Sequence, residues 1–332
     1  MILHPAVLAL FIASLLTSCM VSYAGWHGIR ILTGWDIRSG SELQLSLERR
    51  TYLISTILSY TLAFQVLSLF LFIFTADQLH GLFAGAMCAA GTLNVNRFGY
   101  PLLVVKIVSF MLAGIWLIIN HADTRGYDYP LIKVKYTILL AIIPLVVLEF
   151  FLQAGYFTRL HADVITSCCG SLFSLDRPGI AGDLAGLPGR TMAAAFYAGM
   201  GATFGTGLYY CARGRGVYLF SFVSTATFAI AIAALIAFFC LYFYELPTHH
   251  CPFCILQKEY GFVGYPLYLT LLGGGLAGMG TGVLMPFRNR GTMARIIPPL
   301  QRQLTAAALS LYLVFTLIVS YRLLFSPFRL GE

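Results

Sequence analysis

Charged residues are scarce in this chain. Only 10% of its 332 residues are Asp, Glu, Lys or Arg, while 59% are hydrophobic, and an ordinary soluble domain has about 25% charged residues. This composition excludes a large soluble domain. Since one helical crossing of a bilayer needs roughly 20 apolar residues, the length allows about eight crossings. We therefore predict an all-α, polytopic membrane protein in contact with membrane lipid.

The sequence also lacks the marks of several other protein classes. Its net charge is +8, but the Lys and Arg residues are spread over short segments between apolar runs, so we expect no nucleic-acid partner. No GxxxxGK[ST] phosphate-binding loop is present, and any ATP-driven partner would be a separate chain. The apolar N-terminus has no positively charged n-region, so we expect a retained first helix and no cleaved signal peptide.

Apolar runs long enough to span a bilayer predict eight transmembrane helices. They cover residues 5–25, 52–76, 100–120, 131–153, 191–211, 217–244, 262–286 and 303–325. A further apolar stretch at 79–93 is too short to cross, which favours a re-entrant or interfacial segment near 79–95. The runs at 191–211 and 262–286 are rich in glycine at small-x-x-x-small spacing, a pattern typical of closely packed membrane helices.

The distribution of Lys and Arg predicts the orientation of these helices. Most of them fall in the first, third, fifth and seventh connections, which are therefore expected to be cytoplasmic. Both termini would lie outside, in a periplasm or its equivalent, with the protein in the inner (cytoplasmic) membrane. The sequence Gly-Tyr-Pro-Leu starts helices at Gly99 and Gly264, shortly after Cys88 and Cys254. This weak repeat favours two tandem four-helix units over 1–153 and 191–332, separated by an outer loop over 154–190.

Five of the eight cysteines then fall on the outer face, the compartment in which disulfides form and persist. They are Cys88, Cys168, Cys169, Cys251 and Cys254. The other three, Cys19, Cys211 and Cys240, lie within or at the ends of predicted helices, and we interpret them as small buried packing residues.

The motif Cys251-Pro-Phe-Cys254 is the sharpest chemical signal, because it stands where the predicted helix over 262–286 enters the membrane. Backbone N–H groups at a helix N-terminus stabilise a thiolate, and His250 could add positive charge. The thiolate is the form that attacks disulfides. A static disulfide and a zinc clip are the alternatives.

The run Cys251-Pro-Phe-Cys254-Ile-Leu-Gln257-Lys258 resembles the quinone-reducing motif of the DsbB-type disulfide oxidoreductases, with the VKOR group as a more distant relative. Lys258 stands where that family usually has Arg. The resemblance implies electron transfer from a periplasmic thiol protein, through a second cysteine pair, to the C-x-x-C motif and then to a quinone. Cys168 and Cys169 would be the relay pair, and Gln257 and Lys258 would line the quinone site.

The same residues also fit a metal site. His249, His250, Cys251 and Cys254 offer imidazole and thiolate ligands within six residues, a donor set that suits copper, zinc or mercury. The leading hypothesis is a membrane thiol-disulfide oxidoreductase, an enzyme. The alternatives are a soft-metal or metallocofactor transport or assembly protein, and a non-catalytic subunit bound to other membrane subunits of a larger complex.

Two charged residues fall inside predicted membrane helices. Lys106 and Glu149 lie in the helices over 100–120 and 131–153, at the same outer level. Charged groups within a membrane usually mark functional sites. The other interpretation is an ion pair that locks these two helices together.

Overall fold

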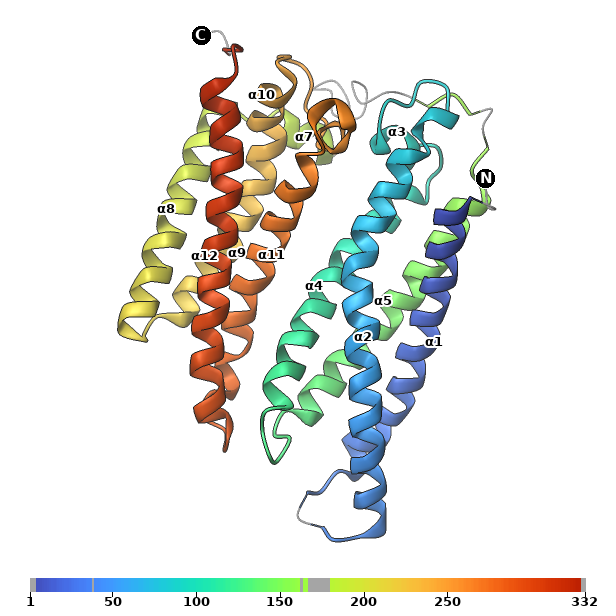
Figure 1. The fold of residues 1–332 in the computed structure, drawn as a ribbon, viewed down its shortest axis with the longest axis vertical. Helices are drawn as coiled ribbons and strands as arrows, with labels where there is room; N and C mark the ends of the chain where they lie inside the picture. Colours follow the sequence, from blue (N-terminus) through green and yellow to red (C-terminus); the bar gives the residue numbers. More distant parts are fainter. Residues whose placement is uncertain (1–3, 38, 162–163, 167–179, 330–332) are drawn as a thin grey trace. The chain divides into compact units, whose positions relative to one another are not determined.

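All regular structure in the described part of the chain is helical. The computed structural model describes residues 4–37, 39–161, 164–166 and 180–329, which contain helices and no strand (Figure 1). The long helices are α1 (Pro5–Gly34), α2 (Glu42–Gln78), α4 (Gly99–Asp123), α5 (Ile132–Thr158), α8 (Gly189–Arg213), α9 (Val217–Ala234), α11 (Gly264–Val283) and α12 (Met293–Phe325). The shorter ones are η1 (His80–Leu82), α3 (Ala89–Leu93), α7 (Ile180–Ala185), η2 (Leu235–Phe239), α10 (Cys240–Tyr244), η3 (Cys254–Leu256), η4 (Lys258–Tyr260) and η5 (Met285–Phe287).

Seven helical segments in the described residues are long and apolar enough to cross a membrane, which is consistent with an integral membrane protein. They are Pro5–Gly34, Glu42–Leu82, Gly99–Asp123, Ile132–Thr158, Val217–Tyr244, Gly264–Phe287 and Met293–Phe325. The prediction of eight spans is therefore supported for seven. Helix α8 forms where the remaining span was expected, but its many Gly, Thr and Tyr residues lower its hydropathy.

The repeated Gly-Tyr-Pro-Leu sequence begins a helix in both places, as predicted. Helix α4 starts at Gly99 and α11 at Gly264. The proline of each copy is the third helical residue, where its missing N–H would have had no partner within the helix. The short apolar stretch at 79–93 contains η1 and α3 instead of one long helix. Its re-entrant character stays a prediction.

The chain divides into two compact units by its contacts. Unit 1 comprises residues 1–75, 96–161 and 286–300, and unit 2 comprises 76–95, 162–285 and 301–332. The predicted tandem arrangement over 1–153 and 191–332 stays a prediction. One difference from those boundaries matters for the site, because residues 76–95 belong with unit 2. Tertiary hydrogen bonds hold them there, including Thr166 N–H to the carbonyl of Ala84 at 3.0 Å.

Unit 1 has an apolar core with charged groups buried beside it. Helix α5 packs along both α1 and α4, and Leu62, Trp116 and Leu139 lie fully buried in the core. Lys106 Nζ lies 2.6 Å from Glu149 Oε1, with both side chains almost inaccessible. The interpretation of these two residues as an ion pair between helices is therefore confirmed.

Unit 2 is built on close helix contacts. Helix α9 packs against α8 and α11. A Cβ atom added at Gly278 of α11 would lie 1.9 Å from Ser224 Oγ of α9, so only glycine permits this approach. The close packing predicted for the helix over 262–286 is confirmed at this position.

Candidate functional site

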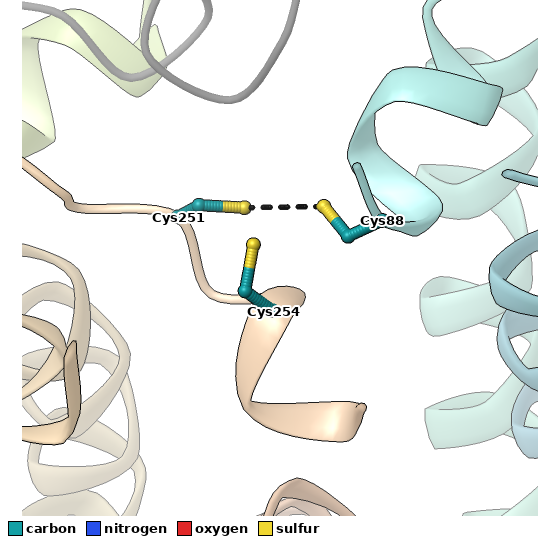
Figure 2. Close-up of side chains that lie close together, drawn as sticks. All are labelled: Cys88, Cys251 and Cys254. Carbon is teal, nitrogen blue, oxygen red and sulfur yellow. Dashed lines mark hydrogen bonds between the residues drawn. The ribbon is translucent and has the colours of Figure 1, made fainter. Parts of the chain in front are cut away.

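Three buried thiols meet within unit 2. The Sγ atoms of Cys88, Cys251 and Cys254 all lie within 4.8 Å of one another, and those of Cys88 and Cys251 are 3.7 Å apart. Figure 2 shows the three side chains converging, Cys88 from the start of α3 and the other two from the loop before α11. The residues are 0%, 0% and 5% exposed, respectively. The site thus combines the C-x-x-C motif with a thiol 163 residues away in sequence.

Cys88 is placed by the hydrogen bonds of its neighbours. Its own backbone is extended, with φ −159° and ψ −177°, and the chain then turns into α3. Asp77 Oδ1 accepts a hydrogen bond from the N–H of Ala89 at 3.2 Å. Thr166 Oγ1 donates to the carbonyl of Gly91 at 2.9 Å. Both contacts hold the residues that directly follow Cys88, so segments outside α3 help to fix the position of the thiol.

Two tyrosine hydroxyls hold the Cys251–Cys254 turn. Tyr244 donates to the carbonyl of Cys251 at 2.5 Å and accepts from the N–H of Ile255 at 3.0 Å. Tyr268 donates to the carbonyl of Pro252. Each hydroxyl satisfies backbone groups that would be costly to bury without a partner. The turn is therefore held in place by α10 on one side and α11 on the other.

A third tyrosine borders the same turn. The ring of Tyr260 packs edge-on against that of Tyr244, with centroids 5.0 Å apart. Burial raises the pKa of Tyr260, and the negative charges of a Cys254 thiolate and of Glu259 act in the same direction. This hydroxyl therefore keeps its proton at neutral pH beside the thiols.

The two predicted histidine ligands differ in their contacts. His249 Nε2 lies 3.4 Å from Cys254 Sγ, which makes it a possible fourth ligand. His250 Nδ1 lies 2.9 Å from the carbonyl of Ile236, and because a carbonyl only accepts, Nδ1 must carry the proton. Ile236 belongs to the π-helical turn η2, a form often found at functional sites. His250 thus ties the motif to η2, and its role as a thiolate stabiliser stays a prediction.

The C-x-x-C motif does not stand at the start of the long helix, which corrects one expectation. Cys254 begins the three-residue helix η3, and α11 begins only at Gly264. Gly261 and Phe262 have φ values of +65° and +56°, so the chain turns sharply before α11. Nine residues therefore stand between Cys254 and the first residue of α11, so the motif does not form the N-terminus of that helix.

The spacing of the sulfur atoms fits shared ligation better than a covalent bond. A disulfide has an S–S distance of about 2.05 Å. Two thiolates on one tetrahedral zinc, each with a Zn–S distance of about 2.3 Å, lie about 3.8 Å apart. The 3.7 Å between Cys88 and Cys251 is a non-bonded contact in which either thiol can donate to the other, and it is compatible with two ligands of one ion. All six cysteines in the described residues are thiols: Cys19, Cys88, Cys211, Cys240, Cys251 and Cys254.

The remaining predicted site residues lie elsewhere. Cys168 and Cys169, the expected relay pair, lie outside the described residues. Gln257 and Lys258 line a separate polar pocket, where Gln257 Nε2 donates to the carbonyl of Met87. Their role in quinone binding stays a prediction.

Sequence reasoning did not place Cys88 in the site, and it missed Tyr244 and Tyr268. The signal for Cys88 was present, because the repeat puts a cysteine ahead of each Gly-Tyr-Pro-Leu helix start. No such signal marks the tyrosines, since each resembles many other aromatic residues in apolar helices.

No protein-family model, curated protein or solved structure matches this chain. The likeness to the DsbB-type motif thus stays confined to Cys251–Lys258. The chemistry of the site has to be argued from the three thiols and their surroundings.

Proposed function

We propose that this chain is an integral membrane protein whose Cys88–Cys251–Cys254 cluster binds a soft d¹⁰ metal ion, Cu(I) or Zn(II), in metal transport or metallocofactor assembly. The observation that carries the proposal is the convergence of three buried thiols within 4.8 Å. Thiolates are the preferred ligands of these ions. His249, at 3.4 Å from Cys254 Sγ, would complete a Cys₃His set, one of the usual structural zinc donor sets.

The third thiol distinguishes this site from a simple redox pair. A C-x-x-C motif needs only its own two sulfurs to form a disulfide, whereas a metal gains from every further ligand. The hydrogen bonds from Tyr244 and Tyr268 to the carbonyls of the turn also have the character of outer-sphere contacts, which orient metal ligands and tune affinity.

For the membrane setting we propose eight crossings, with α8 as the eighth. Its 25 residues are long enough to span, and it packs along α9, an apolar candidate span. The Lys and Arg distribution favours an inner membrane with both termini outside. The three-thiol cluster would then lie at the outer level, where a periplasmic protein could exchange metal with it.

Metal binding to the purified full-length protein tests the proposal. Anaerobic, reduced protein in detergent should bind about one equivalent of Cu(I) or Zn(II). Structural zinc sites bind with about 10–16 kcal/mol, so losing one of four ligands costs about 3 kcal/mol, roughly a 100-fold loss of affinity. We expect that loss in each of Cys88→Ser, Cys251→Ser and Cys254→Ser, measured by competition with a chromophoric chelator.

Cys211→Ser is the matched control, because Cys211 lies in α8 of the same unit, outside the cluster. It should bind metal like the wild type. Wild-type protein that binds neither ion, or three cluster variants that bind as tightly as the control, would refute the proposal. Spectra of the protein loaded with Co(II) or with Cu(I) then distinguish the two metals. Co(II) in a four-ligand Cys₃His zinc site gives the visible bands of tetrahedral cobalt, whereas bound Cu(I) has no such bands.

Thiol-disulfide exchange is the second candidate, favoured by the 3.7 Å contact between the sulfurs of Cys88 and Cys251. A Cys251–Cys254 disulfide would accept two electrons and two protons from a partner dithiol, which becomes a disulfide. A quinone would then take the electrons and protons and become a quinol. The Cys88 thiolate could attack Cys251 of the Cys251–Cys254 disulfide, which forms a Cys88–Cys251 disulfide and releases Cys254 as a thiolate. Maleimide labelling would detect Cys251 and Cys254 lost as thiols when a quinone is added and recovered with a dithiol.

A further inference from the structure

A polar pocket lies beside the three-thiol cluster, entirely within unit 2. Its volume is about 320 Å³, and its lining includes Asp77, His80, Met87, Gln257 and Glu259. These side chains offer a thioether, an imidazole and two carboxylates, all of which bind metal cations. The pocket therefore has the donor chemistry of a metal site without the tight convergence of the thiols.

The pocket is joined to the cluster through the two segments that carry the thiols. Met87 precedes Cys88, and Gln257 follows Cys254 by three residues. Gln257 Nε2 donates to the carbonyl of Met87, so this hydrogen bond links the two segments at the pocket wall. Asp77, in that wall, also accepts from the N–H that follows Cys88.

The pocket and the three-thiol cluster differ sharply in solvent exposure. Met87 is 63% exposed, whereas Cys88, its neighbour in the chain, is fully buried. In an extended backbone, successive side chains point to opposite sides, and Cys88 is extended. The thioether thus stands on the outer side of this stretch and the thiol on the cluster side. A hydrated ion cannot reach the thiols without first losing water, and the pocket supplies replacement ligands.

The other pocket groups are suited to a positive ion. The carbonyl of Asp77 contacts His80 Nδ1, which orients the imidazole and leaves Nε2 as the nitrogen that can bind a metal ion. The carboxylates of Asp77 and Glu259 outnumber the single ammonium of Lys258 in the lining. Their field favours a cation over an anion.

We propose that this pocket is the loading site through which Cu(I) reaches the three-thiol cluster, with Met87 as its first sulfur ligand. The inference rests on the proposed metal-binding function. In the transfer step, the bond between copper and the Met87 sulfur breaks and one between copper and Cys88 Sγ forms. The thiol proton passes to water, and copper stays Cu(I) throughout. Thioethers bind Cu(I) well and are not among the usual zinc ligands, so Met87 favours copper over zinc.

Loading kinetics of the full-length protein in detergent test this inference. Cu(I) is supplied from a coloured Cu(I) chelate, and its transfer is followed by stopped-flow absorbance in wild type, Met87→Leu and the control Met20→Leu. Met20 is an exposed methionine of α1 in unit 1. We expect Met87→Leu to slow loading about 10-fold, as the loss of supporting groups around a metal does. Its equilibrium affinity should stay within about twofold, because release slows equally.

Two further arms separate the outcomes. Zn(II) loading should be equally fast in Met87→Leu and wild type, and Glu259→Gln should slow loading most at low salt, where long-range attraction is strongest. Equal Cu(I) loading rates in Met87→Leu and Met20→Leu would overturn the inference while leaving the proposed function intact. A large loss of equilibrium affinity in Met87→Leu would also overturn it, since Met87 would then be a permanent ligand. Wild-type protein that takes up no Cu(I) at equilibrium would overturn both.

Discussion

The two units bury their polar groups in different ways. Both ion pairs found in the described residues belong to unit 1, Lys106–Glu149 at 2.6 Å and Lys135–Asp123 at 2.8 Å. Unit 2 buries three thiols close together at one place. In unit 1 the charged groups satisfy one another, whereas in unit 2 the converging groups are ligands that suit a metal ion. Under the proposed function, the ion pairs of unit 1 stabilise the fold, and the thiols of unit 2 form the binding site.

The ion pairs of unit 1 are supported by further hydrogen bonds. Gln65 Nε2 donates to Glu149 Oε2 at 2.6 Å, and Lys106 Nζ lies 5.3 Å from the centre of the Phe72 ring. Asn120 Oδ1 accepts from Lys135 at 3.1 Å. A buried pair of charges is tolerable only when such additional partners are present.

Helices α9 and α11 of unit 2 meet along a row of glycines. Added Cβ atoms would lie 2.7 Å from Phe228 at Gly275, 1.9 Å from Ser224 at Gly278 and 2.4 Å from Ser221 at Gly282. Each distance is far below van der Waals contact, so α9 and α11 approach closely along this row. Such contacts are typical of membrane helices, where packing replaces the hydrophobic effect as the driving force.

The largest effect we predict is from breaking an ion pair in unit 1. Glu149→Leu leaves Lys106 as an uncompensated buried charge, which should lower the free energy of unfolding by about 3–5 kcal/mol. Denaturant-induced unfolding of the purified full-length protein, followed by circular dichroism, measures this loss. Metal affinity of the folded protein should be unchanged, because the cluster lies in unit 2.

The double variant Lys106→Met with Glu149→Leu is the control. Replacing both charges with apolar groups should restore stability to within about 1 kcal/mol of wild type or exceed it. If the double variant is as unstable as the single one, the cost comes from lost packing and not from the buried charge. If either variant loses metal binding, the ion pair of unit 1 also supports the thiol cluster, and the two units do not differ in the way described.

A smaller effect is expected from the glycine contacts of unit 2. Gly278→Ala forces α9 and α11 apart, and overpacking of this kind costs about 1–3 kcal/mol. Gly205→Ala in α8 is the matched control, because no atom lies within 4 Å of its added Cβ. That change should raise stability by about 0.5–1 kcal/mol through helix propensity. Equal unfolding midpoints for the two alanine variants would contradict close packing at Gly278.

The smallest predicted effect concerns the support of the thiols. Tyr244→Phe removes the hydroxyl that bridges Cys251 and Ile255 and should weaken metal binding about 10-fold, the lower end of the range for outer-sphere contacts. Chelator competition measures the change. Tyr242→Phe, on the same short helix α10, should leave affinity unaltered. A Tyr244→Phe protein with wild-type affinity would show that the turn needs no such support.

Much of the helical fold could be predicted from the sequence because hydropathy is a local property. Seven predicted spans coincide with helices that are long and apolar enough to cross a membrane. Helix α8 lies where the eighth span was predicted, but its hydropathy is lower than theirs. The glycines at 99 and 264 marked helix starts through the proline two residues later. Opposite charges at Lys106 and Glu149 indicated their pairing, since a lone charge in an apolar setting is costly.

Only part of the candidate site could be predicted from the sequence. Cys251 and Cys254 form a C-x-x-C motif, whose spacing alone predicts thiol chemistry or metal binding. His249 could be predicted as a ligand because it lies two residues before Cys251. Cys88 and Met87 lie far away in the chain, and the Gly-Tyr-Pro-Leu repeat points to Cys88 without showing that it contacts the motif. The hydroxyl contacts of Tyr244 and Tyr268 depend on how helices pack, which composition does not encode.

The sequence alone therefore determined that this protein is helical, that its helices suit a membrane, and that one of its motifs holds two closely spaced cysteines. These properties follow from short-range patterns of apolar residues and ligand spacing. Only the tertiary structure decided that Cys88 joins this motif and that a pocket with Met87, His80 and Asp77 borders it. The reason is physical: residues 76–95 take their place through hydrogen bonds to distant segments, and those bonds exist only once the chain has folded.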